Sequence, residues 1–191
     1  MTEKLSWDQR YRRGEHLLDQ PAPLVAGVAD GLIPARALDL ACGPGRHALL
    51  LVTRGWQVTA VDASRVAIEI LVKRARDLNV TVDARLADLE KHEFEIEPGC
   101  FDLICDCYYL QGDLFPAICA GVRPGGLIIA IIHMLDDSAD VKPMNPAYLL
   151  RSGELAGFFA GWRILHAREG KPVDALHKRA VAEIVAQRPI A

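Results

Sequence analysis

A glycine-rich loop between two apolar runs is the feature that most constrains this chain. The segment from Ala37 to Arg46 reads ALDLACGPGR, and the apolar run 48–52 follows it. That order is typical of a buried strand, a tight loop and the start of a helix. Gly43 and Gly45 lack a Cβ, so the backbone can adopt left-handed angles and a ligand can approach closely. The helix would direct its unpaired N–H groups toward whatever the loop holds.

A carboxylate, Asp39, stands just before these glycines. A loop that binds phosphate avoids a negative charge beside the anion, whereas a ligand with cationic groups is attracted by one. The ammonium and sulfonium groups of S-adenosylmethionine therefore suit this loop better than a pyrophosphate does.

Composition limits the class of protein. A chain of 191 residues with 51% hydrophobic content fits one compact domain with a full core. The net charge is −3 and the positive charges are scattered, which gives no electrostatic footprint for nucleic acid. The start is polar, and no apolar stretch reaches the roughly 18 residues of a membrane helix. Five cysteines without the spacing of a zinc site predict a reduced, cytoplasmic protein with no disulfide and no metal.

Strand-like and helix-like runs alternate through the middle of the chain. We expect strands over 36–40, 57–62, 80–86, 101–109 and 127–132, and helices over 24–29, 46–54, 65–78 and 113–120. Ser64 is a suitable N-cap for the third of these helices, and residues 123–126 read as a turn. Such alternation predicts a parallel sheet with right-handed crossovers.

The two ends of the chain depart from this alternation. Residues 7–14 mix two aromatic side chains with three arginines. They predict either an amphipathic helix packed on the domain or a lid whose Trp7, Arg10 and Tyr11 close over a ligand. After His133 we expect a polar mobile loop over 136–146, a short helix over 152–159, and a closing β-hairpin from 162–167 and 175–186.

Four acids lie at the ends of predicted strands or just after them, namely Asp39, Asp62, Asp88 and Asp106. Ligands of open α/β sheets bind beyond the carboxyl ends of the strands. Asp62 is placed to accept hydrogen bonds from ribose hydroxyls, and Asp88 from an adenine amine. Asp106 can face the methionine end of the ligand or remain a solvated acid. A Rossmann-like domain whose acids have no ligand is the alternative reading.

With these motifs in order, the sequence resembles the class I S-adenosylmethionine-dependent methyltransferases. The resemblance covers residues 36–132 and runs through the segments 38–46, 58–64, 85–89, 101–104 and 123–130. The N-terminal segment 7–11 is similar to that of the tellurite-resistance and thiopurine methyltransferase branch. One departure is Ala41, where the first motif often has glycine.

The resemblance implies a Rossmann-like, seven-stranded, mostly parallel sheet with helices on both faces and an antiparallel C-terminal strand. It implies one domain over 1–191, with a lid at 1–30, a cofactor-binding core at 36–132, and a substrate-side loop and hairpin at 133–191. The expected cofactor is S-adenosylmethionine, with S-adenosylhomocysteine as product. The expected cofactor-binding residues are Trp7, Arg10, Tyr11, Asp39, Ala41, Cys42, Gly43, Gly45, Asp62, Ala63, Ala87, Asp88, Leu89 and Asp106.

Methyl transfer from a sulfonium depends on holding the reacting atoms in line and excluding water, so it need not use an acid or base. No catalytic residue is therefore assigned. Tyr108, Tyr109 and His133 are candidates for lining the substrate side, with packing or structural roles as alternatives.

The expected acceptor is a small molecule such as a thiol, a metalloid oxyanion or a xenobiotic, handled by a monomer or homodimer without nucleic acid or membrane. The alternative function is a non-catalytic S-adenosylmethionine-binding sensor or partner subunit. A nicotinamide-dependent oxidoreductase would instead need a third glycine in the loop and a Tyr/Lys pair in a later helix.

Overall fold

The computed structural model describes residues 6–172 and 178–190. The chain forms two compact units, Met1–Glu95 and Ile96–Ala191, and each is described by itself below. The expectation of one domain over 1–191, with its three parts, stays a prediction.

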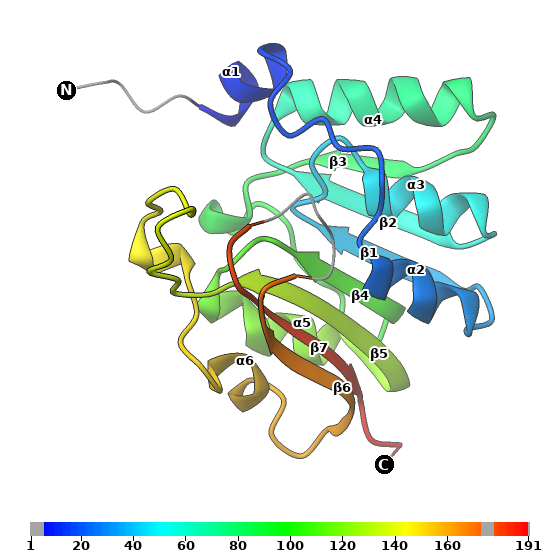
Figure 1. Cartoon of the computed structure of the whole chain (residues 1–191). Coiled ribbons are helices and arrows are strands. Elements are labelled where there is room, and N and C mark those ends of the chain that lie inside the picture. Colours follow the sequence, from blue (N-terminus) through cyan, green and yellow to red (C-terminus); the bar gives the residue numbers. More distant parts are fainter. Residues whose placement is uncertain (1–5, 173–177, 191) are drawn as a thin grey trace. The chain divides into compact units, whose positions relative to one another are not determined.

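The first unit is an alternating α/β structure that follows the predicted order (Figure 1). Its elements are α1 (Trp7–Arg12), α2 (Pro23–Asp30), β1 (Arg36–Leu40), α3 (Arg46–Thr53), β2 (Gln57–Asp62), α4 (Arg65–Asp77), β3 (Asp83–Leu86) and the 3₁₀ turn η1 (Leu89–Lys91). The strands run parallel in the order β3-β2-β1. Because α3 contacts β1 and β2 while α4 contacts β2 and β3, the apolar side chains of β1 and β2 are buried beneath helices.

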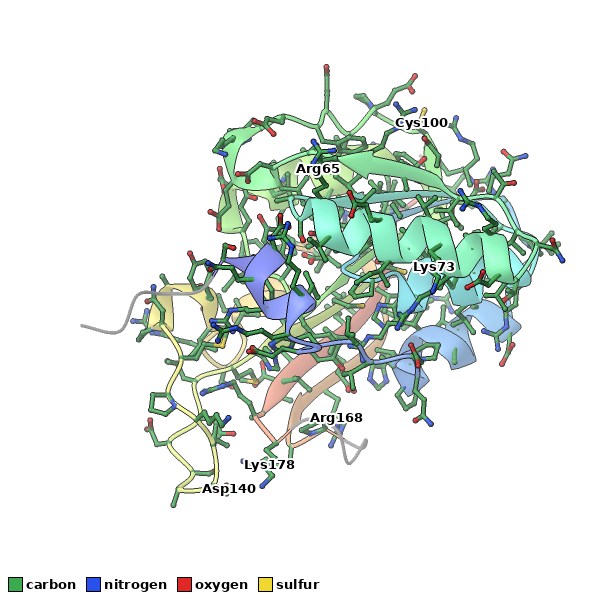
Figure 2. All side chains as sticks on the ribbon, turned by 90° about the horizontal axis from the view of Figure 1, so that it is seen from above. Arg65, Lys73, Cys100, Asp140, Arg168 and Lys178 are labelled. Atoms are coloured by element: carbon green, nitrogen blue, oxygen red, sulfur yellow. The ribbon has the colours of Figure 1, made fainter. Side chains whose placement is uncertain are left out.

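Helix α4 begins where its sequence predicts. The Ser64 hydroxyl accepts a hydrogen bond from the Ala67 N–H at 3.2 Å, which caps the first turn. The buried face carries Ala67, Leu71 and Ala75, whereas Arg65 and Lys73 are exposed (Figure 2). Leu78, the last residue of the predicted helix 65–78, is 52% exposed, because the helix has already ended at that residue.

The third strand is shorter than the expected 80–86. Asn79 adopts a left-handed φ of 54° after the helix and donates to the carbonyl of Arg76. The Val80 N–H donates to the carbonyl of Ala75. These two bonds form the closing motif of a helix C-terminus, so Val80 belongs to the end of α4 and β3 begins only at Asp83.

The second unit contains the remaining elements (Figure 1). They are β4 (Phe101–Cys107), the 3₁₀ turn η2 (Gly112–Leu114), α5 (Phe115–Gly121), β5 (Val122–His133), the 3₁₀ turn η3 (Pro146–Tyr148), α6 (Glu154–Gly157), β6 (Arg163–Gly170) and β7 (Val181–Gln187). Their strand order is β4-β5-β7-β6. Strands β4 and β5 are parallel, and β7 is antiparallel to both β5 and β6, which confirms the antiparallel last strand and the closing hairpin. Residues 175–177 of that predicted hairpin lie outside the described residues.

Residues 123–126 were expected to form a turn but are part of β5. The register of β4 against β5 jumps between Phe101 and Leu103, so the four residues form an irregularity within the strand. Gly125 keeps a left-handed φ of 79°, and its N–H donates to the carbonyl of Arg188 at 3.0 Å. The hydrogen bonds that Gly125 and Gly126 form with Arg188, the residue after β7, extend the pairing of β5 with β7 along residues 123–126.

The loop after β5 is attached to the residues that precede β7. Asp136 accepts hydrogen bonds from the Ala180 N–H at 2.7 Å and from Lys171 Nζ at 2.9 Å. Hydrogen bonds with Ser138, Lys171 and Ala180, in that order of effect, keep the pKa of Asp136 below the usual range. The buried Arg179 guanidinium donates to the carbonyls of Met134 and Lys142. The polar loop expected at 136–146 is thus held at several points.

Candidate functional site

The glycine-rich loop joins β1 to α3 through three left-handed backbone positions. Ala41, Gly43 and Gly45 have φ values of 48°, 53° and 84°. Gly45 is the N-cap of α3, so the helix begins immediately after the last glycine of the loop. The frequent glycine at the first of these positions in the related motif now has a physical reason, because alanine must adopt a backbone conformation that glycine reaches without strain.

Replacing Ala41 with glycine is expected to raise the free energy of unfolding. The left-handed conformation costs an L-residue about 1–2 kcal/mol, and the greater freedom of glycine in the unfolded chain returns about 0.5–1 kcal/mol of that. The net gain is then between zero and about 1.5 kcal/mol, and urea denaturation measures it. Ala26→Gly, inside α2, is the matched control, and it should lose about 1 kcal/mol. A loss at Ala41 as large as at Ala26 would contradict the assignment of strain.

Asp39 is buried at the end of β1 and faces the start of α3. Its Oδ2 accepts a hydrogen bond from the Ala48 N–H at 3.0 Å, one of the otherwise unpaired donors of the first helical turn. Burial raises its pKa to about 7, against the opposing effects of that hydrogen bond and of Arg46. A buried acid that is easily protonated is one that a nearby cationic group would stabilise in its charged form.

Asp62, the last residue of β2, joins the glycine-rich loop to the start of α4. Its Oδ2 accepts from the Gly43 N–H and its Oδ1 from the Ser64 N–H, both at 2.8 Å. Burial raises the pKa of Asp62, with the two backbone hydrogen bonds acting in the opposite direction. Ala63, next to it, is exposed. Asp62 therefore fixes the loop while it is itself buried, at 8% exposed.

The N-terminal helix α1 is docked on this same region of the first unit. Asp8 accepts hydrogen bonds from the Ser64 hydroxyl at 2.5 Å and from the Val66 N–H at 3.4 Å, and the Ser64 bond holds its pKa below the usual range. The Tyr11 hydroxyl lies so close to Gly43 that a Cβ added there would stand 3.0 Å from it. The helix thus covers the loop and also contacts the turn that Asp62 organises.

Aromatic and cationic side chains of the N-terminal segment are stacked on one another. The rings of Trp7 and Tyr11 are 5.8 Å apart, and Arg10 lies 5.4 Å from the centre of the Trp7 ring. His16 meets Trp7 edge-on at 5.5 Å. Tyr11 is buried, whereas Trp7 is 54% exposed. The structure therefore places Tyr11 against the glycine-rich loop, with Trp7 stacked on Tyr11 and Arg10 lying over Trp7.

Asp88 follows β3 and caps the 3₁₀ turn η1 by accepting from the Glu90 N–H at 3.0 Å. It also pairs with Lys91 at 2.8 Å, and that hydrogen bond lowers its pKa. Ala87 and Leu89 on either side are buried. An adenine amine that donates to the Asp88 carboxylate would therefore bind beside Lys91, which already contacts that carboxylate.

Two residues in and just after the glycine-rich loop, Cys42 and His47, are buried. Burial raises the pKa of the Cys42 thiol well above the usual value, which fits a packing role for this small side chain. His47 is the second residue of α3. It is 4% exposed, and its Nε2 accepts from the Ala22 N–H at 3.2 Å. Because Ala22 and His47 are 25 residues apart in the sequence, no local pattern could have indicated this contact.

In the second unit, the predicted substrate-side residues gather at the carboxyl ends of β4 and β5. Asp106 lies within β4 and is 1% exposed, so it is not the solvated acid of the alternative reading. Tyr108 follows the strand with a left-handed φ of 66°, which is unusual for a bulky side chain. Its ring lies 5.3 Å from that of His133, and the Tyr109 hydroxyl donates to Gln111 at 2.5 Å.

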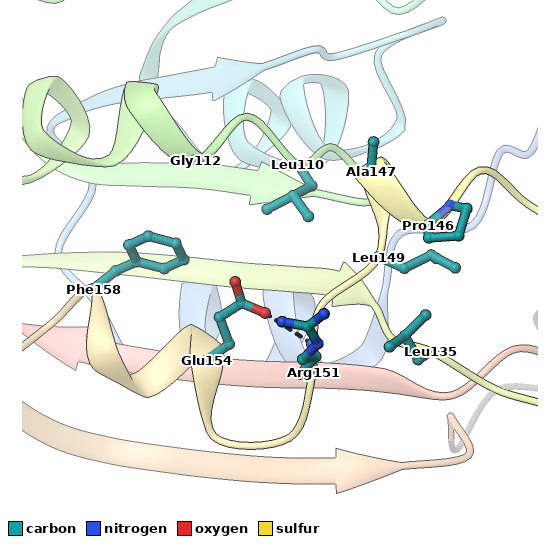
Figure 3. Close-up of a pocket in the computed structure, with 9 residues that line it drawn as sticks. All are labelled: Leu110, Gly112, Leu135, Pro146, Ala147, Leu149, Arg151, Glu154 and Phe158. Carbon is teal, nitrogen blue, oxygen red and sulfur yellow. Dashed lines mark hydrogen bonds between the residues drawn. The ribbon is translucent and has the colours of Figure 1, made fainter.

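A pocket of about 290 Å³ opens beside these segments of the second unit (Figure 3). It is lined by Leu110, Gly112, Leu135, Pro146, Ala147, Leu149, Arg151, Glu154 and Phe158. None of the lining residues was singled out by the sequence, because loops separated by tens of residues come together to form the pocket.

The described parts of the chain contain neither a candidate metal site nor a helix that could span a membrane. No group of three or more His, Cys, Asp or Glu side chains within 6–172 and 178–190 is arranged to hold a metal ion. Over the same ranges, every helix is too short or too polar to cross a bilayer.

Comparison with known proteins points to one family. Residues 37–126 match the family model of the methyltransferase domain. Hemagglutinin 1 of Eikenella corrodens is 28% identical over 164 residues, which are 83% of this chain and 54% of that protein. The probable S-adenosyl-L-methionine-dependent methyltransferase TehB of Haemophilus influenzae is 24% identical over 81% of this chain and 54% of its own length. The chain thus spans about half the length of these curated relatives.

Solved structures share the fold. The crystal structure of TehB from Haemophilus influenzae has a TM-score of 0.76 at 21% identity, covering 95% of this chain and 67% of that one. The 1,6-didemethyltoxoflavin-N1-methyltransferase of Burkholderia thailandensis, solved with 1,6-didemethyltoxoflavin and S-adenosylhomocysteine, has a TM-score of 0.69 at 20% identity over 94% of this chain and 84% of that one. The predicted fold class, a mostly parallel seven-stranded sheet with antiparallel pairing at the last strands, is confirmed. The ordered motifs and this fold agree with the match of residues 37–126 to the methyltransferase domain, and over these residues the chain resembles the S-adenosylmethionine-dependent methyltransferases.

Proposed function

We propose that this protein transfers a methyl group from S-adenosylmethionine to a small-molecule acceptor. The observation that carries the proposal is the network around Asp62, which links the glycine-rich loop to the start of α4 and leaves the exposed Ala63 beside it. A loop built in this way offers backbone groups and a carboxylate to a ligand that carries both a ribose and positive charges.

Residues of the first unit have chemistry that fits each part of the cofactor. Asp62 would accept from ribose hydroxyls, and Asp88 from the adenine amine, with the buried Ala87 and Leu89 supporting the ring. Asp39 would balance the cationic methionine end, since a buried acid with a pKa near 7 is stabilised as a carboxylate by a neighbouring positive charge. Trp7, Arg10 and Tyr11 would cover the bound ligand.

The remaining loop residues would allow the backbone of the loop to pass close to the cofactor. Gly43 and Gly45 allow the left-handed turns, and Ala41 and Cys42 provide small side chains there. Asp106 in the second unit would face the methionine end of the cofactor.

The bound cofactor supplies a sulfonium methyl group that is already reactive. The protein's contribution is then to orient the acceptor and to exclude water. Tyr108, Tyr109 and His133 would line the acceptor side. A soft anion such as a thiolate can arrive deprotonated, whereas a hydroxyl or amine acceptor would require a general base. Thiols, metalloid oxyanions and xenobiotics are the acceptor classes that we propose to screen.

The setting that we propose is a cytoplasmic monomer or homodimer. The formal charge of −3 and the scattered lysines and arginines favour a small acceptor over a nucleic acid, and no membrane partner is proposed.

Binding of S-adenosylhomocysteine, measured by calorimetric titration, tests the proposal. The wild type should bind at micromolar concentration, and Asp62→Asn should bind at least tenfold more weakly, a loss of about 1.4 kcal/mol. The reason is that an asparagine at 62 removes the charge and one of the two acceptor oxygens that hold the loop and the ribose.

Asp77→Asn, at the exposed end of α4, is the matched control and should bind like the wild type. Thermal unfolding of each variant checks that it is folded. A well-folded wild type that fails to bind S-adenosylhomocysteine would overturn the proposed function.

A further inference from the structure

The pocket of the second unit is lined in part by close sequence neighbours of the residues proposed to face the acceptor. Leu110 and Gly112 follow Tyr109 along the chain, and Leu135 follows His133 by two residues. Its volume of about 290 Å³ lies near the lower end of the range for small-molecule sites. The inference below depends on the proposed function, because that function gives Tyr109 and His133 their roles.

The wall of the pocket combines apolar and polar surface, and six of its nine lining residues are apolar. The apolar lining residues are Leu110, Leu135, Pro146, Ala147, Leu149 and Phe158. The Phe158 ring stacks on that of Phe115 with centroids 3.9 Å apart, which fixes one wall against α5. Such a lining favours the apolar body of a ligand over a fully hydrated ion.

One cation and one anion complete the wall. Arg151 and Glu154 both line the pocket, and Figure 3 shows their side chains next to each other. The Glu154 Oε2 accepts a hydrogen bond from the backbone N–H of Arg151 at 2.9 Å. Among the residues that the structure describes, no ion pair joins the Arg151 guanidinium to an acid, and Arg151 is exposed.

The turn that carries these two side chains is held in place from β6. Glu169 accepts from the Gly153 N–H at 2.7 Å and from the Ser152 hydroxyl at 2.6 Å. Gly153 has a left-handed φ of 79°, which lets the chain reverse before α6. The guanidinium is thus attached to a backbone that needs no reordering when a ligand binds.

We infer that this pocket takes the acceptor itself, and that the acceptor is a small apolar molecule with a single anionic group, such as a carboxylate, that pairs with Arg151. A guanidinium presents parallel N–H donors that match a carboxylate in two hydrogen bonds. The neighbouring Glu154 carboxylate disfavours a second negative charge on the ligand. The apolar wall then holds the rest of the molecule.

Three molecules of nearly equal shape and different charge test this inference, namely phenylacetate, phenylacetamide and phenethylammonium. Binding is measured by NMR titration of the full chain. Phenylacetate should bind at least tenfold more tightly than the other two, and added salt should weaken it selectively. Equal binding of all three molecules would overturn the inference.

Variants locate the binding. Arg151→Gln should weaken phenylacetate at least tenfold and leave phenylacetamide unchanged, whereas Arg163→Gln, on the exposed start of β6, should change neither. Ala147→Trp, at an exposed lining residue, should fill the pocket and abolish both. Glu154→Gln keeps an oxygen for the Arg151 N–H but removes the negative charge, so it should tighten phenylacetate several-fold. An Arg163→Gln effect as large as that of Arg151→Gln would overturn the assignment.

Titration with S-adenosylhomocysteine separates the two proposals. If S-adenosylhomocysteine binds and phenylacetate shows no dependence on Arg151, the acceptor inference fails while the proposed function stands. If phenylacetate binds through Arg151 and S-adenosylhomocysteine does not bind at all, the proposed function fails, and the assignment of the pocket to a methyl acceptor fails with it.

Discussion

Asp39→Asn is expected to stabilise the folded protein at pH 8 by up to about 4 kcal/mol, at about 1.36 kcal/mol for each unit of pKa shift. Burial raises the pKa of Asp39 to about 7, so the folded state binds this proton more tightly than the unfolded chain does. The stability that the protonated acid contributes is complete below about pH 4, decreases as the pH rises, and is lost above about pH 7. An asparagine can keep the hydrogen bond from the Ala48 N–H without carrying a buried charge.

The measurement is urea unfolding of both proteins at pH 5 and pH 8. The difference between them should be largest at pH 8 and should shrink at pH 5, since most of Asp39 is then protonated in the folded state. Asp77→Asn at the exposed end of α4 serves as the charge-matched control, with a change below about 0.5 kcal/mol. A difference that is the same at both pH values would contradict the burial argument.

If Asp39 also faces the cationic end of the cofactor, Asp39→Asn should weaken S-adenosylhomocysteine while it stabilises the protein. Asp39 would then lower the stability of the folded protein at neutral pH while it strengthens ligand binding, a trade-off that is common at functional sites.

Gly45→Ala is expected to destabilise the protein by about 2–5 kcal/mol, combining the left-handed backbone with overpacking. The φ of Gly45 is 84°, and a Cβ there would stand 2.2 Å from Cδ1 of Leu71. Leu71 is fully buried in α4, so its side chain has no open space into which to move. Urea unfolding measures the loss.

Gly27→Ala is the matched control for this substitution. Gly27 lies inside α2 with no atom within 4 Å of the added Cβ, and it should gain about 0.5–1 kcal/mol. The steric part of the Gly45 effect is isolated by repeating it in a Leu71→Ala background, where the cost should be smaller. An equal cost in both backgrounds would show that Leu71 is not the obstacle.

Local sequence patterns determined much of the first unit. Residues 36–40 and 57–62 form strands at the predicted bounds, because apolar runs bounded by loop residues indicate buried strands directly. The helix start at Ser64 followed from a side chain that caps its own neighbours. The antiparallel last strand also agreed with the resemblance to the family.

Bonds between distant residues decided what local patterns missed. Val80 has a strand-forming side chain, but its N–H is used to close α4, so the strand begins later. Residues 123–126 have the composition of a turn, but the carbonyl of Arg188 receives the Gly125 N–H and draws them into β5. Neither partner can be identified from nearby sequence.

The candidate site divides in the same way. The sequence by itself identified Asp39, Asp62 and the glycines, because strand-end acids and a loop without Cβ atoms are local signals. Only the tertiary structure showed that Asp62 joins the Gly43 and Ser64 N–H groups and that Asp8 contacts Ser64 from 56 residues away. It alone brought Arg151 to an apolar pocket, since the walls of that pocket come from loops whose contacts depend on the packed sheet beneath them.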